Sequence, residues 1–115
     1  MSPIRIIQSA LNRDELNTIA QERFGDMVKA VVDMDRKIVA IGGEMHADEE
    51  QVLMEGGSQQ QDLWGINLYP GKKGDDFIEF DSMINIRPSQ GNRSRGVEDA
   101  DMRKRIREIV SSFID

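Results

Sequence analysis

The chain has 115 residues and no cysteine, which excludes disulfides, thiolate metal sites and a cysteine nucleophile. This length suffices for one hydrophobic core, and we expect residues 1–115 to form a single domain without a linker. The formal net charge of −6 argues against non-specific coating of nucleic acid, because that binding mode depends on neutralising phosphates.

The first part of the chain predicts a strand and then a helix. Residues 1–8 contain no long apolar run beside a basic flank, so we expect neither a signal peptide nor a membrane span, and cytoplasmic localisation is the default. Residues 4–7 are a candidate edge strand. Asn12 and Glu15 have the spacing of a capping box, and Gly25 marks the end of the helix. Its apolar stripe consists of Leu16, Ile19, Ala20 and Phe24.

The middle of the chain predicts two hairpins around a short helix. Residues 27–33 and 37–42 are rich in β-branched side chains and close enough in sequence to form an antiparallel pair. Residues 47–55 begin with acidic side chains and end at a glycine pair, as a short helix does. Residues 62–69 and 76–87 are the next two strands, joined by a turn-rich connection.

A final helix over residues 98–113 completes the predicted fold. Its apolar side chains follow helical spacing and are Met102, Ile106, Ile109, Val110 and Phe113. Hairpins dominate the connections and no βαβ pattern repeats. The sequence therefore predicts an α+β fold with a four-stranded antiparallel sheet of two hairpins and helices packed on one face, in the order (β)αββαββα.

Two carboxylates in the second hairpin are the first candidates for chemistry. Glu79 and Asp81 stand two residues apart on an expected strand, so both project from one face, and Asn67, Asn85 and Arg87 are expected to share that face. Such a set can hold magnesium or transfer a proton. The alternative is the solvated side of an antiparallel sheet, where acids and arginines pair across strands.

His46 is the only histidine and the third catalytic candidate, beside Glu79 and Asp81. Carboxylates flank it at Glu44 and Asp48, which suits a general base or a single metal ligand. With one histidine and no cysteine a zinc site is disfavoured, and we predict no metal centre. A serine–histidine–carboxylate triad through Ser82, Ser89 or Ser94 stays open, although the chain has no Gly-x-Ser-x-Gly elbow. A loop histidine near a helix start, without a catalytic role, is the simpler alternative.

Residues 85–96 form an arginine-rich loop directly before the last helix. Arginine forks, close backbone amides at glycines and a helix N-terminus together favour binding of an anion. The candidate ligand-binding residues are Asn67, Asn85, Arg87, Ser89, Asn92, Arg93, Ser94 and Arg95. In the alternative, Glu98, Asp99 and Asp101 satisfy the helix dipole themselves and pair with Arg93 and Arg95.

Two runs, DLWGINLYP at residues 62–70 and FIEFDSMINIRPSQGNRSRGVED at residues 77–99, resemble a family of small bacterial proteins known only as a domain of unknown function. The similarity extends from about residue 40 to the C-terminus. It implies a free-standing, single-domain cytoplasmic protein, and it brings no activity, cofactor or site residue with it.

Three functions remain in competition. The first is a ligand-binding protein or small enzyme. Its ligand is a nucleotide or another anionic small molecule that bears phosphate or carboxylate. In this reading the arginine loop binds the anion, and His46, Glu79 or Asp81 transfers a proton. The second is a protein-interaction module or homodimer without catalytic activity, since residues 38–71 lack any lysine or arginine while residues 85–107 are locally basic. A nucleic-acid binder or small ribonuclease is the least favoured because of the net charge. The sequence indicates no particular cofactor and leaves open whether the protein is an enzyme.

Overall fold

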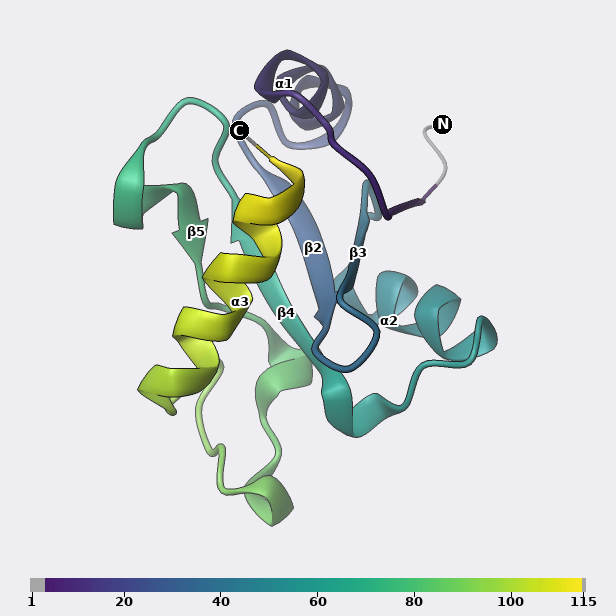
Figure 1. Cartoon of the computed structure of the whole chain (residues 1–115), viewed down its shortest axis with the longest axis vertical. Helices are drawn as coiled ribbons and strands as arrows, with labels where there is room; N and C mark the ends of the chain where they lie inside the picture. Colours follow the sequence, from purple (N-terminus) through teal and green to yellow (C-terminus); the bar gives the residue numbers. More distant parts are fainter. Residues whose placement is uncertain (1–3, 115) are drawn as a thin grey trace.

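Within residues 4–114, five antiparallel strands form one sheet at the centre of the fold (Figure 1). The computed structural model describes residues 4–114, so residues 1–3, on which the signal-peptide expectation partly rests, and residue 115 lie outside it. The strands are β1 (Arg5–Ile7), β2 (Val28–Asp33), β3 (Ile38–Ile41), β4 (Leu63–Leu68) and β5 (Ile78–Glu79), in the spatial order β1-β3-β2-β4-β5. The α+β class and the antiparallel sheet are confirmed. The predicted count of four strands is wrong, because β1 pairs along β3 as a fifth, edge strand.

The three α-helices of the described residues begin close to where the sequence predicts them. They are α1 (Arg13–Arg23), α2 (His46–Glu55) and α3 (Ala100–Phe113). The side chain of Asn12 caps α1 by accepting a 2.8 Å hydrogen bond from the Glu15 amide, and Asp99 caps α3 in the same way from the Asp101 amide, also at 2.8 Å. Phe24, assigned to the apolar stripe of α1, is instead 39% exposed. Within residues 4–114, no helix has the length and apolar character needed to cross a bilayer.

The helices cover both faces of the sheet, whereas the sequence predicts them on one face. Residues of α1 and α3 pack with Val32 and Ile66 in the larger core cluster, and Leu53 of α2 packs with Val31 and Leu63 in a second cluster. Figure 1 shows α3 in front of the sheet and α2 behind it. The central strands are apolar on both faces, so leaving either face in water would expose a large apolar area.

The second hairpin departs most from the prediction. A strand over residues 76–87 is expected, but β5 pairs with β4 over two residues only, and a 3-10 turn, η3 (Met83–Asn85), follows. In a continuous strand, Ile78 and Ile84 would project from the same face of the sheet. Because the turn intervenes, Ile78 belongs to the core on the α3 side, whereas Ile84 packs against the cluster on the α2 side. A second turn, η4 (Pro88–Gln90), leads into the loop before α3.

The side chain of Asn85 takes the place of the missing strand. Its Oδ1 accepts a 2.8 Å hydrogen bond from the Gly65 amide, and its Nδ2 donates to the Gly65 carbonyl at 2.9 Å. The same Nδ2 donates to the Arg95 carbonyl at 2.9 Å. Asn85 is fully buried. One side-chain amide therefore satisfies the outer edge of β4 where β5 has ended.

A buried carboxyl group fixes the start of α2 against the sheet. Glu49 is fully buried, and its Oε2 accepts a 2.9 Å hydrogen bond from the Gly43 amide. Burial raises the pKa of Glu49 well above its usual range, with the Gly43 bond opposing. A Cβ at Gly43 would lie 2.8 Å from Glu49 Cγ, so glycine is required for this approach. The contact sets the position of His46, one turn earlier on α2.

Replacing Asn85 by alanine should destabilise the fold. The change leaves two buried backbone groups of Gly65 without partners, and each such group costs about 1–3 kcal/mol. We expect the free energy of unfolding, measured by urea denaturation, to fall by at least about 2 kcal/mol. Asn17, exposed on α1, gives the matched control, since Asn17→Ala should change stability by less than about 0.5 kcal/mol. Equal stability of the two variants would contradict the structural assignment of Asn85.

Candidate functional site

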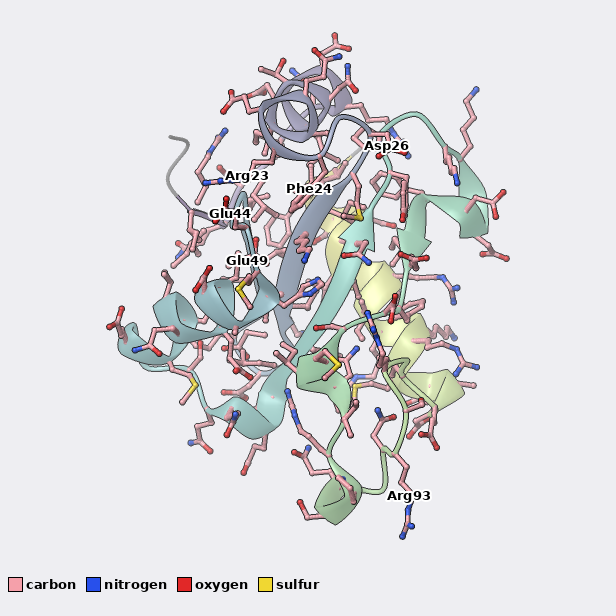
Figure 2. The ribbon with its side chains drawn as sticks, turned by 180° about the vertical axis from the view of Figure 1, so that it is seen from behind. Arg23, Phe24, Asp26, Glu44, Glu49 and Arg93 are labelled. Carbon is pink, nitrogen blue, oxygen red and sulfur yellow. The ribbon has the colours of Figure 1, made fainter. Side chains whose placement is uncertain are left out.

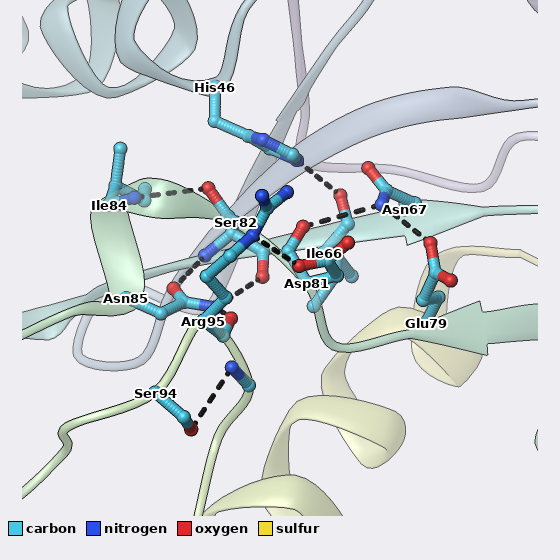
Figure 3. Close-up of polar contacts among 12 residues, drawn as sticks. His46, Ile66, Asn67, Glu79, Asp81, Ser82, Ile84, Asn85, Ser94 and Arg95 are labelled. Atoms are coloured by element: carbon cyan, nitrogen blue, oxygen red, sulfur yellow. Dashed lines mark hydrogen bonds and ion pairs between the residues drawn. The ribbon is translucent and has the colours of Figure 1, made fainter.

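Polar side chains distant in sequence meet at a hollow of about 350 Å³ beside the start of α2. This hollow, called the His46 pocket below, receives His46 from α2, Asn67 from β4, Glu79 from β5, and Asp81 and Arg95 from the segments that follow (Figure 3). The other lining residues used below are Met27, Lys29, Met45, Ser82, Met83 and Ile84.

Strand register places three of these polar side chains in a row. Lys29 of β2 lies opposite Asn67 of β4, which in turn lies opposite Glu79 of β5. Asn67 Nδ2 donates to Glu79 Oε1 at 2.8 Å, and the Tyr69 hydroxyl donates to the same oxygen at 3.0 Å. Burial, together with the hydrogen bond to Glu79, raises the pKa of Tyr69 to about 12, so the hydroxyl stays protonated at neutral pH. The Glu79 carboxylate is thus held on the α2 side of the sheet.

Asp81 and Arg95 form the outer wall of the pocket. Arg95 Nε donates to Asp81 Oδ1 at 2.7 Å, and their side chains are 56% and 40% exposed. Arg95 reaches this position because its carbonyl accepts hydrogen bonds from the Ser82 amide and the Asn85 side chain, both at 2.9 Å. The packing that replaces a longer β5 therefore also places the arginine.

His46 contributes the imidazole of the pocket, and it lies almost completely buried against β4. The ring is 8% exposed, and its Nε2 lies 2.8 Å from the Ile66 carbonyl oxygen. A carbonyl only accepts, so Nε2 carries the hydrogen, and in the neutral ring the lone pair is on Nδ1. Burial lowers the pKa of His46; the Ile66 bond opposes this, and the charge of Lys29 adds to the lowering. The ring is therefore neutral at pH 7 and has the protonation state of a base.

Gly65 forms the floor beneath His46. A Cβ at this position would lie 2.5 Å from Ser82 Cβ and 3.2 Å from His46 Cδ2. Both side chains therefore rest directly on the backbone of β4. Of the three serines considered for a triad, Ser82 is the one that lines the pocket with His46, but it is only 1% exposed and its Oγ accepts a hydrogen bond from the Ile84 amide at 3.2 Å.

The side chains and amides of the arginine loop, residues 85–96, do not converge on a single anion-binding position. The amides of Arg93 and Ser94 donate to Glu98 Oε2 at 2.7 and 2.9 Å, so the chain's own carboxylate takes the position that an external anion would need. The hydrogen bond from the Arg93 amide is the main cause that lowers the pKa of Glu98. The Arg93 side chain extends outward, away from the sheet (Figure 2).

Arg87 lies outside the His46 pocket, and its hydrogen bonds hold the loop to β4. Its Nε donates to the Ile84 carbonyl at 3.0 Å, and Nη2 donates to the carbonyl of Leu63. The guanidinium stacks 4.8 Å from the centre of the Trp64 ring, and Nη2 lies 3.7 Å from Glu50 Oε2. Arg87 lines a second hollow with Ser89 instead.

The remaining candidates in the loop also serve the fold. Asn92 is 5% exposed; its Nδ2 donates to the Asn85 carbonyl at 2.7 Å, and its Oδ1 accepts from the Glu98 amide at 2.9 Å. Ser94 Oγ accepts from the Gly96 amide at 3.3 Å. The structure thus brings together His46, Asn67, Glu79, Asp81 and Arg95 in the pocket, and places Asn85, Arg87, Ser89, Asn92, Arg93 and Ser94 elsewhere.

Sequence reasoning missed Lys29 and the three methionines of the pocket. The signal for Lys29 was present, because it is the single charged residue in the first five positions of β2. Its proximity to Asn67 depends on the pairing of β2 with β4, which no short-range pattern reveals. Within residues 4–114, no group of three or more histidine, cysteine or carboxylate side chains is arranged to hold a metal.

The single histidine makes its protonation directly measurable. We expect nitrogen-15 NMR to show the neutral Nε2–H tautomer, and a pH titration to give a pKa below the usual 6.5. With a lowered folded-state pKa, the unfolded chain binds a proton at His46 more readily than the folded chain does. The neutral ring therefore contributes fully to the free energy of unfolding above about pH 6.5, and this contribution is lost as the pH falls through the folded-state pKa. A pKa at or above 6.5, or the Nδ1–H tautomer, would show that the ring is solvated and not held by Ile66.

Comparison with known proteins identifies a family. A family model described as "Protein of unknown function (DUF5674)" matches residues 5–113. No curated protein and no solved structure matches the chain. Because the match spans nearly the whole sequence, the chain belongs to the DUF5674 family of proteins of unknown function.

Proposed function

We propose that the protein binds a small polar molecule that carries one carboxylate or similar singly charged anionic group, in the His46 pocket. One observation carries the proposal: His46, Asn67, Glu79, Asp81 and Arg95 come from four separate segments of the chain and line the same hollow. Pockets in which a few polar groups converge on an otherwise apolar lining are the usual form of small-molecule sites.

The charges of the pocket favour a ligand with both a negative group and hydrogen-bond donors. Lys29 and Arg95 supply two positive charges, and Glu79 and Asp81 supply two negative charges. A polyphosphate would meet both carboxylates at short range, which disfavours it. A molecule with one carboxylate and one amino, amide or hydroxyl group can pair its carboxylate with Lys29 and Arg95 and donate hydrogen bonds to Glu79 and Asp81. A free amino acid is the simplest molecule of this class.

Methionines complete the lining on the apolar side. Met45 is 56% exposed and Met83 is 67% exposed, and Met27 lines the same hollow. Flexible thioether side chains adapt to aliphatic groups of different shape. The ligand we propose therefore has an aliphatic part next to its charged group.

His46 gives the pocket a capacity for acid–base chemistry. The neutral ring can accept a proton on Nδ1, and Glu79 and Asp81 are the carboxylates that line the same pocket. In the proposal, His46 is the base if the bound molecule is also a substrate, while Arg95 and Lys29 hold the anionic group.

Arg95 and Arg93 offer a matched test, since they are the same residue type two positions apart. Free amino acids, monocarboxylates and nucleotides would be screened by thermal shift and their affinities measured by calorimetry. Loss of a charged hydrogen bond should weaken binding by about tenfold or more in Arg95→Ala. Arg93→Ala should bind as the wild type does, because Arg93 does not line the pocket and its side chain extends outward from the protein (Figure 2).

Three results would overturn this assignment. They are equal losses in the two variants, tighter binding of nucleotides than of monocarboxylates, and an absence of binding by every amino acid and monocarboxylate in the screen. Thermal unfolding of each variant without ligand separates a loss of binding from a loss of fold.

A further inference from the structure

A second hollow of about 530 Å³ adjoins the His46 pocket on the α2 side of the molecule. The two hollows share Met83 and Ile84. Both also lie against α2: Met45, His46 and Ala47 line the first, and Glu50, one turn further along the helix, lines the second. The two hollows therefore lie next to each other between α2 and the η3–η4 segment, with Met83 and Ile84 between them, and we call the pair the α2 groove.

The middle of the α2 groove is apolar and adaptable. Met83 is 67% exposed and Ile86 is 40% exposed, so their apolar side chains are accessible to a ligand. The backbone beneath them is fixed, because Ser82 caps η3 and Asn85 ties it to β4. The η3 turn therefore presents movable side chains on a rigid support.

Both ends of the α2 groove are polar and carry balanced charge. At the first end, Lys29 and Arg95 balance Glu79 and Asp81. At the second end, Arg87 lies 3.7 Å from Glu50, and the neutral side chains of Gln60, Ser89 and Gln90 complete the lining. No excess of positive charge is left at either end for a polyanion.

Among the described residues, no aromatic side chain lines either hollow. Base stacking on aromatic rings, which commonly supports recognition of single-stranded nucleic acid, is therefore not available here. Side-chain amides and hydroxyls at the ends, with aliphatic and thioether groups between them, match the alternating amides and side chains of an extended peptide.

We propose that the α2 groove binds a short peptide, with its terminal carboxylate at Lys29 and Arg95 and an apolar side chain against Met83. The inference rests on the proposed function of the His46 pocket and extends it: a free amino acid fills the first hollow, and a peptide continues past Met83 into the second.

The test compares free leucine with a soluble tetrapeptide that has leucine at its third position. Wild-type protein should bind the tetrapeptide at least about tenfold more tightly, because the second hollow adds contacts. Ser89, exposed on η4 and lining only the second hollow, is replaced by tryptophan to fill that space. Ser89→Trp should bind the tetrapeptide no more tightly than leucine, and its affinity for leucine should equal that of the wild type. Ser111→Trp, at an exposed position of α3, is the matched control and should keep both affinities.

Methyl NMR of the methionines gives a second readout. The tetrapeptide should shift the methyl signal of Met83 and leave the methyl signal of Met34 unchanged. Met34 is 6% exposed and lies in the core on the other side of the sheet.

The peptide proposal fails, while the proposal for the His46 pocket stands, if leucine binds and the tetrapeptide binds no more tightly than leucine. It fails in the same way if Ser89→Trp still binds the tetrapeptide more tightly than leucine. If neither probe binds the wild type, the peptide proposal fails, and the proposed function of the His46 pocket fails as well if no other amino acid or monocarboxylate of the screen binds.

Discussion

The pairing of the Asn85 side chain with the peptide group of Gly65 is the contact on which the rest of the site depends. It closes the edge of β4 where β5 stops after two residues. The same side chain holds the Arg95 carbonyl, so a single buried amide positions both the η3 turn and the arginine of the pocket. Buried amides of this kind specify one arrangement, because any other leaves several polar groups without partners.

The pocket exists because three constraints coincide at the start of α2. The central strands are apolar on both faces, which requires a helix on the side opposite α3. Buried Glu49 fixes that helix to Gly43, and Gly65 lets His46 and Ser82 rest on the sheet. Lys29, Asn67 and Glu79 project toward α2 in one row. Polar residues thus occupy the part of the sheet that α2 leaves uncovered.

Short-range sequence patterns predict the helix starts and the order of the helices and strands. Asn12 and Glu15 mark the start of α1, and the order of helices and strands follows from periodicity and turns. The spacing of Glu79 and Asp81 and the carboxylate-flanked His46 identify three residues that the fold brings to one hollow. The end of β5 is not predictable in this way, because residues 78–87 alternate as a strand does, and the contacts that hold the turn in place of a strand include the long-range bonds of Asn85 to Gly65 and Arg95.

The remaining differences have the same origin in long-range contacts. The position of α2 behind the sheet follows from strands that are buried on both faces, and that signal was present in the continuous apolar run of β3 and in residues 63–66 of β4. The central claim, that the Asn85 side chain and no neighbouring strand protects the edge of β4, is tested most directly by hydrogen exchange of the Gly65 amide. It should exchange as slowly as the amide of Val31 in the central strand. Exchange as fast as that of Gly71, which lies in an exposed turn, would contradict it.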